Sequence, residues 1–250
     1  RVVDLGRKAE YWLPGRREVV FPERKESEVA MCGIVGYIGM EEAAPFLLHG
    51  LQRLEYRGYD SAGVAVYNET GLHVVKSKGR LSVLEGILEG GAKLPGSVGI
   101  GHTRWATHGA PSDVNSHPQV SDGGKFAVVH NGIIENYLEL KNHLLRRGVE
   151  FVSDTDTEVV AQMLEYYYHD DVLAAIQKVI DRVEGSYALG IICADCPEKI
   201  FAVRKDSPLI VGVGRGENFI ASDIPAILSK TRDIYRLKDQ ELSLIHISEP

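Results

Sequence analysis

The sequence is poor in cysteine, in long apolar runs and in unbalanced positive charge. Three cysteines among 250 residues cannot form a closed disulfide framework, which favours a reducing compartment. No apolar stretch reaches the roughly 20 residues that span a bilayer. The first 30 residues mix acidic with basic side chains and lack the apolar segment of a targeting peptide. With a net charge of -7, we expect a cytoplasmic protein whose partners include neither membrane nor nucleic acid.

The composition does provide enough apolar sequence for one large domain. Apolar residues make up 44% and charged residues 25%, as is usual in globular proteins. Strands are expected over residues 32–39, 61–67, 73–77, 98–102, 126–130, 187–193, 200–203, 209–213 and 218–221. Helices are expected over residues 42–55, 83–88, 136–147, 155–168 and 172–183, from apolar stripes at helical spacing and their end signals. This order predicts an α+β sandwich, with antiparallel sheets layered between helices.

Both ends of the chain differ from the domain that we expect over residues 32–241. Residues 1–31 show no core periodicity, and we interpret them as a non-native upstream extension or a removed pro-segment, followed by the initiator Met31. Residues 242–250 read LSLIHISEP, which resembles translated vector sequence, so we expect a foreign or truncated tail.

Cys32 is the candidate nucleophile. Cysteine is strongly nucleophilic, but only a few per cent of a free thiol is ionised at neutral pH, so it needs a base. An N-terminal cysteine carries its own base, because the pKa of an α-amine is about 7.7–8.0. The order Met31-Cys32-Gly33 suits removal of the methionine. Alone, the pattern more often marks a cysteine that packs as a small buried apolar residue than a nucleophile.

Seven longer sequence motifs favour the interpretation of Cys32 as a nucleophile. They are CGIVGYIG at 32–39, LEYRGYDSAG at 54–63, GHTRWATHG at 101–109, HNGIIENY at 130–137, SDTDTE at 153–158, SPLIVG at 207–212 and ENFIASD at 217–223. In this order they closely resemble the glutaminase domain of the glutamine:fructose-6-phosphate amidotransferases (isomerizing), or glucosamine-6-phosphate synthases. The resemblance implies the four-layer αββα sandwich of N-terminal nucleophile hydrolases, with two antiparallel sheets. It also implies glutamine hydrolysis through a Cys32 thioester, without a cofactor.

The other site residues are assigned largely by this resemblance. It implies that Asn131 and Gly132 form the oxyanion hole, although Asn-Gly by itself reads as a turn at a strand end. Arg104 is suited to a bidentate grip on the substrate carboxylate. Asp156 is the expected partner of the substrate ammonium. Asp154 offers the same chemistry at the start of the same helix, and only the family motif selects Asp156.

The remaining candidates rest on the resemblance alone. It places Thr107 and His108 with Arg104 in the glutamine-binding cluster, and Arg57 and Gly58 beside the nucleophile. Trp105 has two interpretations, as core packing or as a lid residue that controls the escape of ammonia.

No metal site is expected. His102 and His108 are six residues apart without nearby carboxylates, which is not a ligand pattern. The pair Cys193 and Cys196 has neither the second pair of a zinc site nor the helix of a redox motif.

The resemblance further implies L-glutamine as the substrate and a missing C-terminal isomerase half, which would bind fructose 6-phosphate and accept the ammonia. We expect the full enzyme to be a homo-oligomer. Two alternatives stay open: the glutaminase module of another class II amidotransferase, such as the phosphoribosyl-pyrophosphate or asparagine-forming kinds, and a catalytically silent glutamine-binding module. In the chain as written the Cys32 nitrogen is an amide, so we expect no activity until Cys32 is the N-terminus.

Overall fold

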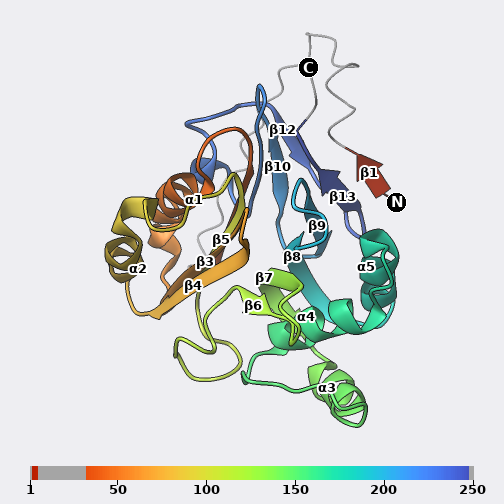
Figure 1. The fold of residues 1–250 in the computed structure, drawn as a ribbon. Coiled ribbons are helices and arrows are strands. Elements are labelled where there is room, and N and C mark those ends of the chain that lie inside the picture. Colours follow the sequence, from red (N-terminus) through yellow and green to blue (C-terminus); the bar gives the residue numbers. More distant parts are fainter. Residues whose placement is uncertain (1, 5–31, 248–250) are drawn as a thin grey trace.

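The computed structural model describes residues 2–4 and 32–247, and they form two facing sheets covered by helices (Figure 1). One sheet contains β2 (Gly33–Ile38), β3 (Ser61–Asn68), β4 (Gly71–Lys78), β5 (Val98–Arg104), β10 (Ile210–Val213), β11 (Asn218–Ala221) and β12 (Ile234–Arg236). The other contains β1 (Val2–Asp4), β6 (Gln119–Val120), β7 (Phe126–Ile134), β8 (Gly185–Cys193), β9 (Ile200–Lys205) and β13 (Leu242–Ile245). Their strand orders are β12-β10-β11-β2-β5-β3-β4 and β1-β13-β9-β8-β7-β6.

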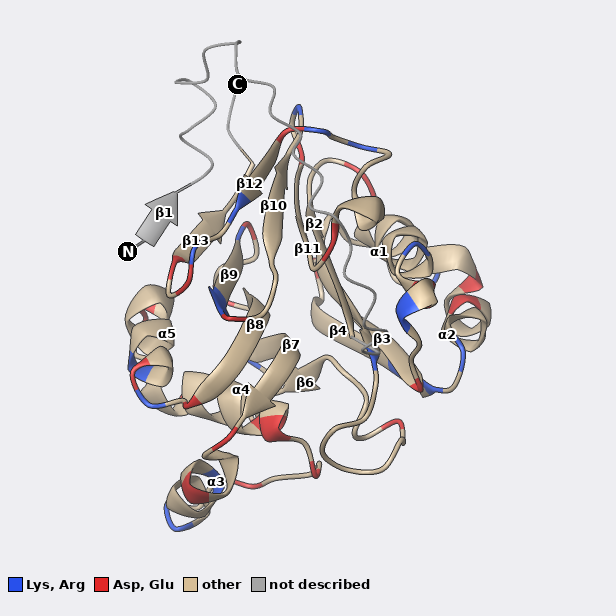
Figure 2. Cartoon of the chain, turned by 180° about the vertical axis from the view of Figure 1, so that it is seen from behind, with Lys and Arg blue, Asp and Glu red and all other residues tan. Residues whose placement is uncertain are grey.

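Helices cover the outer face of each sheet. The β2–β5 side carries α1 (Ala43–Gln52) and α2 (Leu81–Leu88), and the β7–β8 side carries α3 (Tyr137–Leu145), α4 (Asp156–Tyr167) and α5 (Val172–Ile180). In the described residues, short 3-10 turns lie at Glu55–Arg57, Glu89–Gly91 and Ile224–Ala226. Charged residues lie mostly on the helices and loops, while the strands between them are mostly uncharged (Figure 2). The ladders from β2 onward are antiparallel, which confirms the predicted sandwich.

The core lies in three layers, and β2 contributes to two of them. Ile34 and Ile38 belong to the cluster between the sheets, whereas Val35 and Tyr37 pack under α1. Because both faces are covered, the strand reads as a continuous apolar run rather than an alternating one. The third cluster fills the space between the β7–β8 sheet and its helices. The described members of all three clusters lie between residues 34 and 247.

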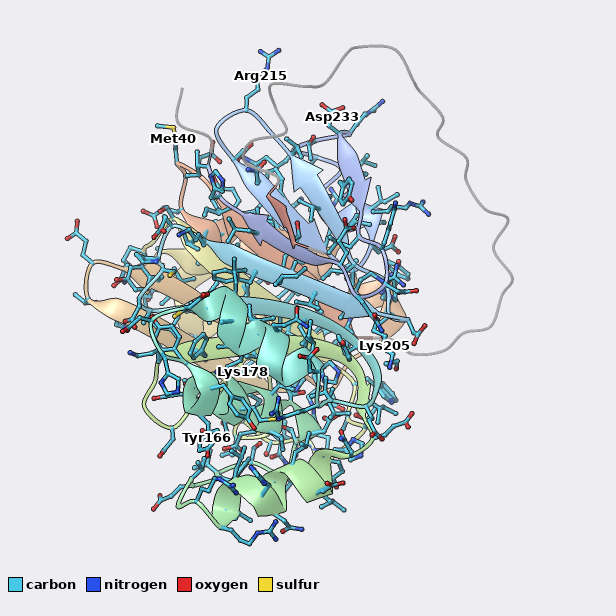
Figure 3. All side chains as sticks on the ribbon, turned by 90° about the vertical axis from the view of Figure 1, so that its right-hand side faces the viewer. Met40, Tyr166, Lys178, Lys205, Arg215 and Asp233 are labelled. Atoms are coloured by element: carbon cyan, nitrogen blue, oxygen red, sulfur yellow. The ribbon has the colours of Figure 1, made fainter. Side chains whose placement is uncertain are left out.

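Strand β2 also joins the two ends of the molecule. It begins directly after Cys32 and ends at Ile38, two residues before Met40, whose side chain is 86% exposed. Figure 3 shows Met40 and Arg215 projecting at the same end. The candidate nucleophile therefore lies at the opposite end of the sandwich from this exposed tip.

Several predicted boundaries were wrong. The strand expected to end at His130 continues as β7 to Ile134, because its last residues pair with β8. The sheet also continues past the expected end at residue 241, where β13 pairs with β9 and buries Leu242 and Ile245. In the proposed upstream extension, β1 runs parallel to β13, and residues 5–31 lie outside the described part of the chain.

In the described part of the chain, no helix is long and apolar enough to cross a membrane.

Candidate active site

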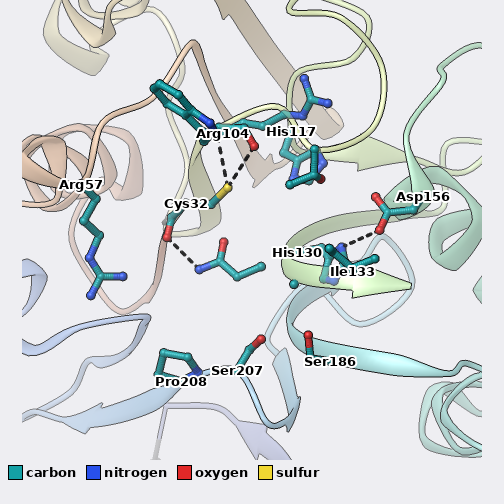
Figure 4. Close-up of a pocket in the computed structure, with 14 residues that line it drawn as sticks. Cys32, Arg57, Arg104, His117, His130, Ile133, Asp156, Ser186, Ser207 and Pro208 are labelled. Atoms are coloured by element: carbon teal, nitrogen blue, oxygen red, sulfur yellow. Dashed lines mark hydrogen bonds and ion pairs between the residues drawn. The ribbon is translucent and has the colours of Figure 1, made fainter. Parts of the chain in front are cut away.

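Cys32 lies at the edge of a cavity of about 240 Å³ that residues from both sheets enclose (Figure 4). The lining residues are Cys32, Arg57, Arg104, Trp105, Thr107, His117, His130, Asn131, Gly132, Ile133, Asp156, Ser186, Ser207 and Pro208. Of the ten predicted site residues, Gly58 and His108 are missing from this lining. Sequence reasoning missed Ser186 and Ser207, which form the wall opposite Arg104 in Figure 4.

The thiol of Cys32 is held by the backbone at the end of β5. The Trp105 amide donates to Cys32 Sγ at 3.1 Å, and Sγ lies 3.6 Å from the Trp105 carbonyl. Burial raises the pKa of the Cys32 thiol, and the Trp105 amide and the charge of Arg104 oppose that rise. Among the described residues, no basic side chain is hydrogen-bonded to Sγ. The thiol therefore needs a base from elsewhere.

The backbone after Cys32 is anchored by two hydroxyl groups. The Gly33 amide donates to Thr103 Oγ1 at 3.2 Å, and the Ile34 amide donates to Ser222 Oγ at 3.0 Å. Both contacts are buried. They fix the first residues of β2, and with them the direction in which the Cys32 backbone enters the cavity.

Asn131 and Gly132 face Cys32 from the other sheet. The Asn131 side-chain amide donates to the Cys32 carbonyl at 2.9 Å. The predicted turn at Asn-Gly was wrong, because both residues are paired with β8 inside β7. Gly132 has φ of 122°, and a Cβ on it would lie 2.1 Å from the Ser186 carbonyl oxygen. Backbone conformation and close approach therefore both require glycine here.

Three buried histidines lie beside the cavity, and sequence reasoning missed their role. His117 and His130 line it, and His102 lies behind them, outside the lining. His102 Nε2 lies 2.9 Å from both the His130 carbonyl and Asn131 Oδ1. The rings of His102 and His117 are 4.4 Å apart. Burial lowers the pKa of His102 to about 3, and it also lowers the pKa values of His117 and His130. All three rings are therefore neutral at physiological pH.

Because these three histidines are neutral in the folded chain, we expect the free energy of unfolding to fall as the pH falls. In the unfolded chain each imidazole takes up a proton near pH 6.5, whereas in the folded chain it stays bare to a lower pH. The contribution of the neutral rings to the free energy of unfolding is therefore complete above pH 6.5 and is lost as the pH falls below that value. Between pH 6 and 5, His102, whose pKa in the folded chain is about 3, should lower the free energy of unfolding by about 1.4 kcal/mol per pH unit, and His117 and His130 act in the same direction. Urea unfolding should show this slope, reduced in a His102→Gln variant; an unchanged free energy over this range would contradict it.

Arg104, at the end of β5, is buried with one nitrogen uncommitted. Its Nη2 donates to the carbonyls of His108 and Gly109, the latter at 3.1 Å. Its Nη1 is buried and has no hydrogen-bond partner among the described residues. Such a donor beside a cavity is suited to an anionic group of a ligand.

Asp156 begins α4 and points into the cavity. Thr155 Oγ1 accepts from the Glu158 amide at 3.2 Å and so caps the helix. The Glu158 carboxylate accepts from the Ser153 amide rather than from Thr155. Asp156 Oδ2 accepts from the Ile134 amide at 2.9 Å. This contact ties the helix start to the end of β7.

The alternative carboxylate, Asp154, faces elsewhere. Its side chain lies 3.5 Å from the Asn115 amide nitrogen, and it does not line the cavity. Asp156 does line it, with Oδ1 3.9 Å from His108 Nδ1 and Oδ2 the same distance from His130 Nδ1. The structure therefore distinguishes Asp156 from Asp154, which have the same side-chain chemistry.

The other predicted residues surround this centre at different depths. Thr107 lines the cavity, and Trp105 lines it with a side chain that is 47% exposed. Gly58 has φ of 75° and lies against the Trp105 ring. Arg57 lines the cavity but is paired with Asp223 at 2.7 Å, and Figure 4 shows its guanidinium directed away from the thiol.

His108 stays outside the lining, edge-on to the Tyr137 ring at 4.8 Å. Within residues 2–4 and 32–247, no cluster of three or more His, Cys, Asp or Glu side chains has a geometry that would hold a metal ion.

The fold and this site define a class of protein, and comparison with known families agrees. A family model described as a glutamine amidotransferase domain matches residues 102–229. The chain belongs to the class II glutamine amidotransferase family. Within it, the chain is similar to proteins named glutamine–fructose-6-phosphate aminotransferase (isomerizing). It is 61% identical over 215 residues to that of Caldanaerobacter subterraneus subsp. tengcongensis and 59% identical to that of Clostridium tetani. These matches cover 86% of this chain and 35% of each relative, so the chain spans about a third of their length.

Solved structures support the same fold. The glutamine phosphoribosylpyrophosphate amidotransferase from B. subtilis superposes with a TM-score of 0.75 at 26% identity, over 86% of this chain and 47% of that one. A glutamine aminotransferase class-II domain protein from Silicibacter pomeroyi matches with a TM-score of 0.57 at 12% identity, over 87% of this chain and all of that one. The second match speaks for the fold alone. Together these comparisons confirm the predicted family and the predicted αββα sandwich.

Proposed function

We propose that this domain hydrolyses L-glutamine to glutamate and ammonia through a thioester on Cys32. The observation that carries this proposal is the arrangement around one cavity. A partly buried thiol, an amide donor on the facing strand and an uncommitted guanidinium nitrogen line the same space. Family membership supports the same reaction class.

The proposed reaction begins with the α-amine of Cys32, once it is free, taking the thiol proton. Sulfur attacks the side-chain amide carbon of glutamine, and the resulting oxyanion accepts hydrogen bonds from Asn131 and the Gly132 amide. The ammonium returns its proton to the leaving nitrogen, the C–N bond breaks and ammonia departs. The amine then deprotonates a water that attacks the thioester. The C–S bond breaks, glutamate leaves and the thiol regains its proton.

Substrate orientation is proposed to come from the opposite charges of Arg104 and Asp156. The free Nη1 of Arg104 would bind the α-carboxylate, and Asp156 would bind the α-ammonium. Thr107 lies beside Arg104 in the lining and would add a polar contact. His108 would act through Asp156, because it does not reach the cavity. Trp105, half-exposed at the rim, would cover the bound substrate.

We propose that Arg57 and Gly58 support Cys32 indirectly, without a hydrogen bond to it. Arg57 lines the cavity, and its ion pair with Asp223 connects the turn after α1 to the loop after β11. Gly58 leaves room for the Trp105 ring. Neither residue is hydrogen-bonded to Cys32 among the described contacts, so we assign them no chemical step.

Replacing Arg104 with glutamine should raise KM for L-glutamine about 10- to 100-fold, with a smaller change in kcat. The physical reason is the loss of a charge-assisted contact to the carboxylate, which contributes to binding before and during the reaction. L-glutamine α-amide, which lacks that carboxylate charge, is the matched substrate. The parent should strongly prefer glutamine over the α-amide, and the variant should not. If the preference survives unchanged, Arg104 does not bind the carboxylate.

For the whole protein we propose ammonia transfer to fructose 6-phosphate, forming glucosamine 6-phosphate. The relatives whose names state this chemistry are about 60% identical to the chain, whereas the phosphoribosylpyrophosphate enzyme is 26% identical. A sugar-isomerase half outside these 250 residues would bind the sugar phosphate, and we propose that the full enzyme is a homo-oligomer.

Glutamate release tests the proposed function. A chain beginning at Met31, with the methionine removed after synthesis, should release glutamate from L-glutamine in an enzyme-coupled assay. Cys32→Ala should abolish release, and Cys196→Ala is the matched control at a partly exposed thiol outside the cavity. Glutamine binding by calorimetry without release would favour a silent binding module. Release by Cys32→Ala at the parent rate would overturn the thioester mechanism.

A further inference from the structure

The nucleophile and the proposed oxyanion donor stand on different sheets. Cys32 precedes β2 in one sheet, and Asn131 lies on β7 in the other. Their relation therefore depends on how the two sheets are joined at this end of the sandwich. The side-chain amide of Asn131 can also rotate end over end, and only one orientation presents N–H groups to Cys32.

His102 joins the sheets at this point. It lies on β5, directly opposite Ile34 of β2, and is fully buried. Its Nε2 is 2.9 Å from Asn131 Oδ1 and 2.9 Å from the His130 carbonyl. Both contacts cross from the β2–β5 sheet to β7. The His117 ring packs against the His102 ring with centroids 4.4 Å apart, which limits its freedom to turn.

The hydrogen positions follow from the acceptors. The Cys32 carbonyl can only accept, so the Asn131 nitrogen must face it and Oδ1 must face His102. The His130 carbonyl can also only accept. His102 Nε2 therefore faces two acceptors and must carry the ring hydrogen, which it shares between them. Nδ1 of the neutral ring is then bare, and it has no hydrogen-bond partner among the described residues.

We propose that His102 is a positioning residue for the glutaminase reaction, which holds the Asn131 amide with its N–H groups toward Cys32. This inference rests on the proposed function. One Asn131 hydrogen is used by the Cys32 carbonyl, and the other stays available for the oxyanion. No hydrogen bond joins His102 to the thiol in the described part of the chain, so its effect passes through Asn131. Preorganised donors stabilise an oxyanion because they need no reorientation during the reaction.

The first test is kinetic and uses the chain beginning at Met31, which contains every described residue of the three core clusters. His102→Leu should lower kcat for glutamate release about 10- to 100-fold, with KM within about twofold. His102→Gln should keep most of kcat, because the glutamine amide can place a donor where Nε2 stood. His73→Gln, in the edge strand β4 two strands away from β5 and outside the cavity, should match the parent. An unchanged kcat in His102→Leu would overturn the proposal.

A double-mutant cycle separates positioning from a general structural role. In an Asn131→Ala background, His102→Leu should cause no further loss of kcat, since the group it positions is gone. Losses that multiply would overturn the positioning role while leaving the proposed function intact. A parent that releases no glutamate would defeat the proposed function, and the role of His102 with it.

Nitrogen NMR of the full 1–250 chain provides a readout that does not depend on activity. At pH 7 the His102 ring should show a protonated Nε2 and a bare Nδ1, and the Asn131 side-chain amide signal should move in His102→Gln. If His102→Leu does not fold, this measurement and the kinetics of His102→Gln decide the matter. A ring protonated at Nδ1 alone would overturn the proposal.

Discussion

Glutamate release should depend on a free amino group at Cys32, and a chain that retains residues 1–31 should be at least about 100-fold slower. In the 1–250 chain the Cys32 nitrogen is bonded to Met31, so it is an amide without basicity. Burial raises the pKa of the Cys32 thiol, and no described basic side chain is hydrogen-bonded to it. Losing a positioned general base costs about 10²- to 10⁴-fold.

The comparison needs chemically defined termini. Intact-mass analysis would show whether each sample begins at Arg1, Met31 or Cys32, and the same samples would then be assayed for glutamate release. A sample that retains Met31 is the closest control, because it blocks the amine with a single residue. Equal turnover by an uncleaved 1–250 chain would refute the amine base and require another base near the thiol.

Asn131→Ala should lower kcat about 10²- to 10³-fold with little change in KM. One hydrogen of the Asn131 amide is used by the Cys32 carbonyl, and the other is proposed to stabilise the oxyanion, which exists only during the reaction. Asn131→Asp is the sharper variant, because it keeps the shape but places an acceptor where a donor is needed. Its loss should equal or exceed that of Asn131→Ala.

Thiol reactivity is the control for both Asn131 variants. The described contacts of Cys32 Sγ are with Trp105 and not with Asn131, so alkylation by iodoacetamide should proceed at the parent rate in Asn131→Ala. Near-parent kcat in both variants would exclude Asn131 from the oxyanion hole. A large fall in alkylation rate would show instead that the substitution disturbs Cys32 itself.

Sequence reasoning reached the fold because its strongest signals were local. The long apolar stripes of α1, α4 and α5 gave the helices, and the short apolar runs gave most of the strands. It missed β12 and β13, since their positions in the sheets come from pairing with distant strands. The Asn131-Gly132 turn failed for a related reason. Asn-Gly favours a turn locally, but the ladder with β8 keeps both residues paired within β7.

Site residues could be predicted where the residue type itself suits one chemical role. They could not be predicted where the role depends on a contact with a residue far away in the sequence. The sequence motif led to Cys32 and Arg104, and the structure places both at one cavity. His102 was weighed only as a metal ligand, because β5 is buried on both faces and its pattern does not say which sheet a side chain meets. Its contact with Asn131 crosses between sheets and exists only in the folded chain.

Trapping the acyl intermediate on Cys32 tests the central claim most directly. A chain beginning at Cys32 would be mixed with equimolar L-glutamine, quenched with acid within the first turnover, digested and analysed by mass spectrometry. We predict one γ-glutamyl group on the peptide that contains Cys32, removable by hydroxylamine, and none on Cys193 or Cys196. First-turnover glutamate release without a γ-glutamyl group on Cys32 would contradict the account.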